Sequence, residues 1–388
     1  MRIELTAWSH ETRHLSGEVA TALAQTGLVD VRVADRPDHW RLITDARVGV
    51  AATAGCDLRV APKLDIPRLM FLLAYATDPK GWRELGPLFD VEDDLFAAIA
   101  HGFALQAERA VTPAPLRGYV AVDETASTLR GRVRIGDQLA RRPGLPIPLE
   151  LTYDDHSADI PENRLVRGAT EVLLRMSHVS TRARLRLLRV RATLDDVQPT
   201  RPGPSVRAPQ ITRLNRRYAG ALVLAQLILR GTSIATSRGD VESAAFMFDM
   251  NRVFEDFLSA ALRGALERRG GHVRLQDGRR NLDKAGRITL RPDLTWWQAG
   301  TCRAVIDAKY KALADGGVPN ADAYQMLAYC TAFGLDRGYL VFAKDEQEPV
   351  DHVVAGTGTR ILVRAIDVEC EPDDVLAQVD ALAEEIAR

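Results

Sequence analysis

The sequence predicts a multidomain α+β protein, and three observations lead to this fold class. A chain of 388 residues is longer than one hydrophobic core usually serves, which favours two or three domains. Short apolar runs typical of strands alternate with stretches whose apolar residues recur at helical spacing. The last third of the chain shows the order α-β-β-β-α-β, and 46% hydrophobic with 27% charged residues is typical of a globular protein.

The first predicted domain, residues 1–115, is a small α+β module. Its apolar runs predict strands and then helices, in this order: 29–33, 47–52, 58–61, 67–76 and 92–110. A middle region, residues 116–240, follows with a different pattern. It is predicted to contain an extended part at 118–148, a helix at 161–176, an arginine-rich segment at 182–191, a proline-rich linker at 199–204 and a helix at 214–229.

The third predicted domain, residues 241–388, begins with a helix. Apolar residues from Phe246 to Leu266 fall on one helical face, and Gly270 and Gly271 end the run. Extended runs and a second helix then follow at 272–276, 287–297, 303–310, 321–333 (the helix), 338–343 and 359–366. This order of elements makes the third domain the most readable part of the chain.

Several classes of protein are disfavoured by composition. The four cysteines form no CxxC pair, which argues against a disulfide framework or a zinc ribbon. The N-terminus lacks the apolar stretch of a signal peptide, and no window has the ~18 apolar residues of a membrane span, so we expect a cytoplasmic protein without a membrane partner. No G-x-x-x-x-G-K-[ST] loop occurs, so the chain is not expected to hydrolyse nucleotides itself.

Two aspartates and a lysine are candidates for phosphodiester hydrolysis, which needs a divalent cation, an activated water and a positive group. Asp293 precedes one apolar run, and Asp307 and Lys309 end the next run. Residues 307 and 309 are two apart on a strand, so their side chains share a face. A hairpin turning near residues 298–301 would bring Asp293 close to Asp307, and the carbonyl of Ala308 would be a further ligand for magnesium.

This Asp-x-Lys pattern also has an ordinary explanation, which is an ion pair at a strand end. Only two of the six lysines, Lys80 and Lys309, follow an acidic residue by two positions. Lys80 lies in a predicted turn, whereas Lys309 lies in an apolar strand. In a chain that otherwise prefers arginine, a lysine here is informative because a compact ammonium can hold a water, whereas a guanidinium stays planar and charged.

Other candidates surround these three residues. Glu255 on the first helix could complete an acidic cluster, although a solvated helix face would also explain it. Gln325 and Tyr329 lie four apart on the second helix, where they could bind DNA or hold a carboxylate, and Tyr329 could instead be a core aromatic. The arginines of segment 182–191 could follow a phosphate backbone, but the favoured interpretation is the solvated side of a packed element.

The order of these landmarks resembles the McrC family, whose members are nuclease subunits of McrBC-type restriction systems and belong to the PD-(D/E)xK nuclease superfamily. The resemblance spans most of the chain and is strongest from about residue 246 to 345. It rests on seven segments: Arg59 to Lys63, Arg130 to Arg132, Asp159 to Arg164, Phe254-Glu255, Arg291 to Asp293, Asp307 to Tyr310 and Asp322 to Gln325.

The resemblance implies a Mg²⁺-dependent endonuclease, with Mn²⁺ able to substitute, that cuts modified double-stranded DNA. Asp293 and Asp307 would bind the metal, Lys309 would position the attacking water, and Glu255 and Gln325 match accessory positions. The implied partner is a hexameric McrB-like AAA+ GTPase, whose GTP hydrolysis the chain would stimulate. Arginines of residues 118–142 are candidates for reaching into that ring.

Two alternatives remain open from the sequence. The chain could be a nuclease that works with another motor or alone, in DNA repair or in defence against plasmids or phages. It could also be a non-catalytic activator of an AAA+ ring with a degenerate nuclease fold. A nuclease that makes double-strand breaks needs two active sites, so dimerisation is a further expectation.

Overall fold

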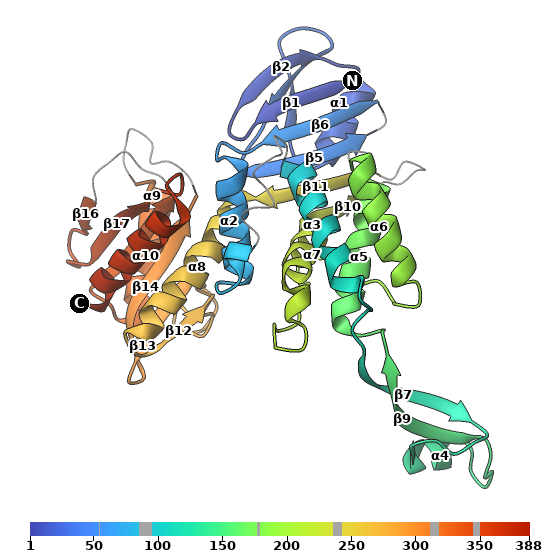
Figure 1. The fold of residues 1–388 in the computed structure, drawn as a ribbon. Coiled ribbons are helices and arrows are strands. Elements are labelled where there is room, and N and C mark those ends of the chain that lie inside the picture. The colour runs from blue at the N-terminus through green and yellow to red at the C-terminus, as the bar shows by residue number, and fades with distance from the viewer. Residues whose placement is uncertain (54, 85–94, 177–178, 236–242, 311–317, 344–349) are drawn as a thin grey trace. The chain divides into compact units, whose positions relative to one another are not determined.

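The computed structural model describes residues 1–53, 55–84, 95–176, 179–235, 243–310, 318–343 and 350–388. By contacts they form two compact units, residues 1–98 with 234–388 and residues 99–233. The predicted segments 1–115, 116–240 and 241–388 stay a prediction of domain organisation. Both units contain helices and strands, as the predicted α+β class requires (Figure 1). Among the described helices, none combines the length and the apolar character that crossing a bilayer demands.

The N-terminal residues fold around two sheets. Their elements are β1 (Arg2–Thr6), β2 (His10–His14), α1 (Gly17–Gln25), β3 (Asp30–Val33), β4 (His39–Ile43), β5 (Arg47–Thr53), β6 (Cys56–Ala61), α2 (Ile66–Thr77) and η1 (Trp82–Glu84). One sheet has the order β2-β4-β3, and the other has the order β1-β6-β5-β11-β10, in which β10 is Thr232–Ala235 and β11 is Ser243–Asp249. Leu23, Leu42 and Leu58 are fully buried in their shared core.

Strand β11 corrects the predicted start of the first helix of the third segment. Phe246 lies in this strand, opposite Val50 of β5, rather than on a helix. Phe246 and Phe248 alternate with the less buried Met247, which is the period of a strand. The helix starts only at Met250, where the side chain of Asp249 accepts a hydrogen bond from the Asn251 amide and caps it.

The unit of residues 99–233 is mainly helical and carries a β arm. Its elements, with the helix that leads into it, are α3 (Leu95–Val111), β7 (Gly118–Ala126), β8 (Arg132–Val133), α4 (Ile135–Arg141), β9 (Leu149–Ser157), α5 (Pro161–Arg175), α6 (Thr181–Thr193), η3 (Arg216–Tyr218) and α7 (Ala219–Gly231). The predicted extended part 118–148 is only partly extended, because it includes α4. We call residues 118–157 the β7–β9 arm, which projects away from the helices of its unit (Figure 1).

The proline-rich segment 199–204 is not a free linker. The amide of Thr200 donates to the carbonyl of Arg164 in α5, and that of Gly203 donates to Leu229 in α7. A β-carbon at Gly168 would lie 2.2 Å from the carbonyl oxygen of Thr200, so the segment packs tightly on α5. Its prolines suit this role because they need no amide hydrogen-bond partner.

The C-terminal residues form a mixed sheet flanked by helices. Its elements are α8 (Met250–Arg268), β12 (His272–Leu275), β13 (Leu294–Gln298), β14 (Thr301–Lys309), α9 (Asn320–Phe333), β15 (Arg337–Ala343), β16 (Val350–Val353), β17 (Arg360–Ile366) and α10 (Pro372–Ala387). The strand order is β12-β13-β14-β15-β17-β16, with β14, β15 and β17 parallel. The predicted order α-β-β-β-α-β is observed from α8 to β15, β17 corresponds to the predicted run 359–366, and β16 and α10 are additional.

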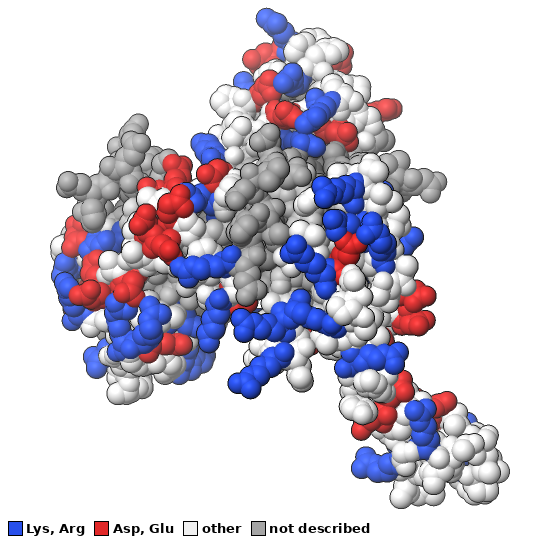
Figure 2. Space-filling view, in the orientation of Figure 1, with Lys and Arg blue, Asp and Glu red and all other residues white. Residues whose placement is uncertain are grey.

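Three helices, α8, α9 and α10, pack against strands of this sheet. Helix α9 buries Met326, Tyr329 and Cys330 against Val305 of β14 and Leu340 of β15. Helices α8 and α10 contact each other, α8 also packs against β14, and α10 packs against β17. Acidic side chains gather where α10 lies (Figure 2). Asp373 and Asp374 are in its first turn, where carboxylates stabilise the helix dipole.

Candidate active site

The candidate site is built on the hairpin of β13 and β14. Ala299 and Gly300 have φ angles of 47° and 79°, which suit a tight turn between antiparallel strands. Leu294 pairs with Ile306, so Asp293, directly before β13, lies beside Asp307 of β14. The amide of Ala308 donates to Oδ2 of Asp293 at 2.9 Å. The predicted hairpin is therefore confirmed, and it brings the two carboxylates together.

Lys309 lies on the same face of β14 as Asp307. Its Nζ is 2.6 Å from Oδ2 of Asp307 and 3.7 Å from Oδ1 of Asp322. Nζ also donates to Oε1 of Gln325 at 3.1 Å. The ammonium is thus held by three oxygens, two of them from α9. The sequence did not predict Asp322 as a site residue. Its spacing of three residues from Gln325 on a helix was the signal that could have done so.

Gln325 and Tyr329 form a chain of hydrogen bonds behind the lysine. Nε2 of Gln325 donates to the Tyr329 hydroxyl at 2.9 Å, and that hydroxyl donates to the carbonyl of Arg291 at 3.2 Å. Only 3% of Tyr329 is exposed, so it is also a core residue, as the alternative interpretation expected. The chain fixes the amide orientation that lets Oε1 of Gln325 accept from Lys309.

Glu255 reaches the site from α8 through a residue that the sequence analysis missed. Its Oε1 accepts from Nε2 of Gln276 at 2.6 Å, and the amide of Gln276 donates to the carbonyl of Asp293 at 2.9 Å. Gln276 has a φ of 46°, which is uncommon for a residue other than glycine. Nothing in the local sequence distinguishes Gln276, because its partners are 21 and 17 residues away.

The electrostatics of the cluster favour a bound cation. Burial, together with the carboxylates of Asp307 and Glu255, raises the pKa of Asp293 to about 8. Burial likewise raises the pKa of Asp307, although Lys309 opposes the shift. Burial lowers the pKa of Lys309, but the carboxylates of Asp307, Asp322 and Asp293 outweigh this and raise it. Two adjacent carboxylates, Asp307 buried and Asp293 half-buried, repel each other when both are charged, and a divalent cation would relieve that repulsion.

The donor set fits magnesium. Among the described residues, no group of three or more His, Cys, Asp or Glu side chains is arranged to hold a metal. Magnesium does not need such a group, because it keeps several waters and takes one or two carboxylates. Asp293 and Asp307 supply two carboxylates, and Ala308 directly follows Asp307 and donates its amide to Asp293. All predicted site residues, Asp293, Asp307, Ala308, Lys309, Glu255 and Gln325, come together, while their chemical roles stay predictions.

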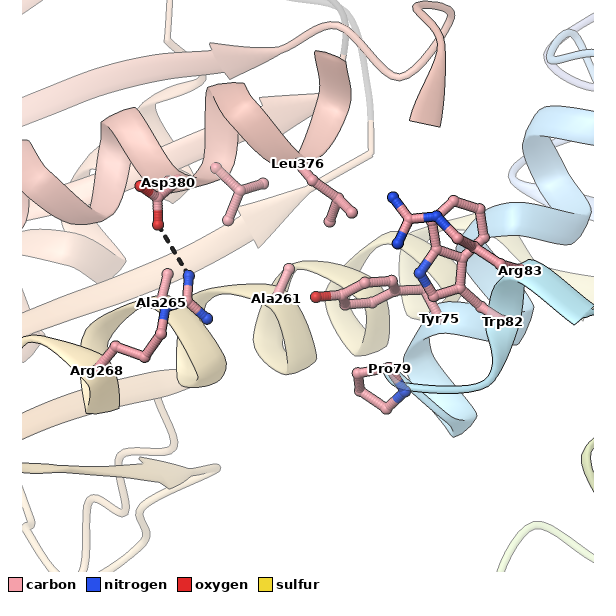
Figure 3. A pocket seen from close by; sticks show the side chains of 10 residues that line it. Tyr75, Pro79, Trp82, Arg83, Ala261, Ala265, Arg268, Leu376 and Asp380 are labelled. Atoms are coloured by element: carbon pink, nitrogen blue, oxygen red, sulfur yellow. Dashed lines mark hydrogen bonds and ion pairs between the residues drawn. The ribbon is translucent and has the colours of Figure 1, made fainter. Parts of the chain in front are cut away.

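A separate pocket of about 250 Å³ is lined by residues of α2, η1, α8 and α10 and contains none of the predicted site residues (Figure 3). Arg83 stacks over Trp82 at 4.7 Å from the ring centroid, and Arg268 pairs with Asp380 at 2.9 Å across the pocket wall. Tyr75 packs on Phe257 of α8, with ring centroids 5.5 Å apart. This pocket lies at the packing of α2 and η1 on α8 and α10.

The arginine-rich segment 182–191 has structural partners. It forms α6, in which Ala183, Leu187 and Val190 are buried. Arg186 and Arg189 both pair with Glu108 of α3, and Arg184 donates to the carbonyls of Leu174 and Met176 at the end of α5. The favoured interpretation of a packed element is confirmed, but only Arg189 lies on its solvated side, because Arg184 and Arg186 are half-buried in these contacts.

Fold and site together define a class: an α+β protein whose C-terminal mixed sheet carries two adjacent carboxylates and a lysine at the end of a hairpin. Residues 42–343 match the family described as McrBC 5-methylcytosine restriction system component. The chain therefore belongs to this family, which confirms the resemblance seen in the sequence. No curated protein sequence matches the chain.

One solved structure shows a similar fold, with a TM-score above 0.5. A refined half-complex from a tetradecameric assembly of Thermococcus gammatolerans McrB AAA+ hexamers with bound McrC matches with a TM-score of 0.60 and 16% identity, over 98% of this chain and 100% of that chain. The cryo-EM structure of the Thermococcus gammatolerans McrBC complex matches with a TM-score of 0.41 and 20% identity, over 69% of this chain and 88% of that one.

Proposed function

We propose that this chain is the McrC-type nuclease subunit of a modification-dependent restriction system. The cluster of Asp293, Asp307 and Lys309 carries the proposal, because it unites an adjacent carboxylate pair, the donor type that magnesium prefers, with a lysine in a chain of the McrBC family. The proposed reaction is Mg²⁺-dependent hydrolysis of phosphodiesters in double-stranded DNA. The proposed partner is a McrB-like AAA+ hexamer, whose GTP hydrolysis the chain would stimulate.

The residues would divide the work as follows. Asp293, Asp307 and the carbonyl of Ala308 would hold magnesium, and bound Mg²⁺ would neutralise charge on the scissile phosphate. Lys309 would hold the attacking water, with its ammonium kept in place by Gln325 and Asp322. Glu255 would add negative charge beside Asp293 and keep Gln276 in position. These contacts make Gln325 and Gln276 positioning residues rather than catalytic ones.

The β7–β9 arm supports the proposal of a partner ring. Its apolar side chains are exposed without a cover in the described chain: Leu129, Ile135, Leu139, Leu145 and Ile147 are each more than half exposed. Glu150 holds three of its arginines, Arg134, Arg141 and Arg142. Arg130 stacks on Tyr153. Among the described arm arginines this leaves Arg132 exposed and without an ion pair, and it is our candidate for contacting the partner.

The test is cleavage of methylated and unmethylated plasmid by the full chain in Mg²⁺, with and without the AAA+ partner and GTP. We expect cutting only when partner and GTP are both present. Cutting without any partner would overturn the GTPase coupling and favour a nuclease that acts alone. Stimulation of GTP hydrolysis without cutting would favour the non-catalytic activator. The Arg132→Ala variant should lower the stimulation of GTP hydrolysis.

A further inference from the structure

A small hairpin leaves the candidate active site between β12 and β13. We call residues 276–290 the site hairpin. Asn281 and Thr289 bridge its two sides, and the amide of Leu282 donates to the carbonyl of Ile288 at 2.9 Å. Oδ1 of Asp283 accepts from the amides of Arg287 and Ile288 at 2.8 and 2.7 Å, which closes the tip. The hairpin is therefore an ordered element, held by its own backbone.

The base of the site hairpin is tied to the site. Gln276 bonds the side chain of Glu255 and the backbone of Asp293, as described above. Next to it, Asp277 is buried and binds Arg279 through both carboxylate oxygens at 2.8 Å. The guanidinium of Arg279 also lies 5.5 Å from the Trp297 ring centroid. Whatever binds the hairpin is therefore brought close to Asp293.

The exposed part of the site hairpin is basic. Arg280 and Lys284 are exposed, as is Arg291 directly after the hairpin, and none of the three forms an ion pair within the described residues. Arg287 is 84% exposed and only 3.8 Å from Asp283 at its closest. The two acids of the hairpin, Asp277 and Asp283, are bound to an arginine and to the backbone, so they leave the outward charge positive. Several basic side chains are seen around β12 and β13 (Figure 2).

Two aliphatic side chains accompany these cations. Leu282 is 42% exposed and Ile288 is 51% exposed. They lie opposite each other across the hairpin, so their side chains share one face. Proteins that bind the minor groove of duplex DNA frequently place aliphatic side chains in the groove. Arginine and lysine side chains beside them can then contact the phosphates on either side.

We propose that the site hairpin binds duplex DNA and holds the scissile strand at the candidate active site. Arg280 and Lys284 contact phosphates, and Leu282 with Ile288 lies against the groove. The inference rests on the proposed nuclease function. It adds a DNA contact on the nuclease chain itself, apart from any contact that the partner makes.

The test is DNA binding by the full chain in EDTA, where a metal-dependent nuclease does not cut, measured by fluorescence anisotropy across a salt series. The Arg280→Ala/Lys284→Ala variant should have a log-log salt slope lower by about 2, since each phosphate contact contributes about 0.9. The wild type should then lose about tenfold more affinity than the variant between 50 and 200 mM salt. The Leu282→Ser/Ile288→Ser variant should bind more weakly with an unchanged slope.

The matched control is Arg263→Ala/Arg303→Ala, which removes two exposed cations from α8 and β14 of the same unit. An equal change of slope in the control, or no change in the hairpin variant, would overturn the proposal. It is likewise overturned if the hairpin variant keeps its DNA affinity but binds the AAA+ partner more weakly. Wild-type cleavage is scored separately, so an inactive wild type that still binds through the hairpin refutes only the proposed nuclease activity.

Discussion

At the scale of residues, the candidate site centres on Asp293, Asp307 and Lys309, and Gln276 and Asp322 contact this triad from neighbouring segments. Asp293, Asp307 and Lys309 stand out because their spacing, strand period and apolar context agree, and the structure brings them together. Gln276 could not be predicted, because its role follows from a left-handed backbone and from partners distant in the chain. Asp322 could have been predicted from the sequence, because it lies three residues before Gln325 and therefore on the same face of the helix.

The carboxylate pair leads to a prediction about stability. In EDTA, Asp293→Asn should raise the free energy of unfolding by about 1 kcal/mol, because the burial and the neighbouring carboxylates that raise the pKa of Asp293 do not disfavour an amide, whose oxygen still accepts from the Ala308 amide. That change corresponds to a rise of roughly 2–4 °C in Tm. Mg²⁺ at a hundred times its Kd should stabilise the wild type by about 2.7 kcal/mol and leave the variant unchanged.

Differential scanning calorimetry in EDTA and in Mg²⁺ measures both effects. The outcome that contradicts this account is an equal Mg²⁺ shift in wild type and Asp293→Asn, because Asp293 would then not be a ligand.

At the scale of elements, the spacing of apolar residues predicted most helices and strands. The elements that it did not predict correctly have physical explanations. Helix α10 was not predicted because five acidic residues obscured its apolar stripe, in which Val375, Val379, Leu382 and Ile386 are buried at helical spacing. The run from Phe246 to Met250 fits both a strand and a helix, and pairing with β5 decides for the strand. Tertiary contacts of this kind cannot be derived from a local pattern.

The turn after α8 yields a prediction with a built-in control. Gly270 and Gly271 both have positive φ, 96° and 86°, so alanine at either position should cost about 1–3 kcal/mol. A β-carbon at Gly271 would also lie 2.3 Å from the Trp297 carbonyl oxygen, whereas at Gly270 the nearest atom is 3.9 Å away. Gly271→Ala should therefore lower the free energy of unfolding by about 1–3 kcal/mol more than Gly270→Ala does. Its urea midpoint should be correspondingly lower. Equal urea midpoints would show that the hairpin of β13 and β14 moves freely away from β12.

At the scale of the whole molecule, we propose that one chain performs two tasks, docking on a partner ring and cleaving DNA. The β7–β9 arm, with exposed apolar side chains and Arg132, would engage the partner ring, and the carboxylate cluster would cut DNA. The sequence showed both tasks only through the family resemblance, because neither composition nor net charge distinguishes a protein that docks on a ring. Since each chain carries one such cluster among its described residues, a double-strand break would need two copies.

The most direct test is DNA cleavage by the complex of the full chain with its AAA+ partner and GTP, comparing wild type with Asp307→Ala and Asp78→Ala. Asp78 is the matched control, because it stands before the only other Asp-x-Lys lysine, Lys80, and caps the end of α2. Stimulation of GTP hydrolysis should be the same in all three and shows that each protein is folded and docked. We predict that Asp307→Ala abolishes cleavage while Asp78→Ala cuts like the wild type; an Asp307→Ala protein that cuts at the wild-type rate would contradict the assignment of the active site.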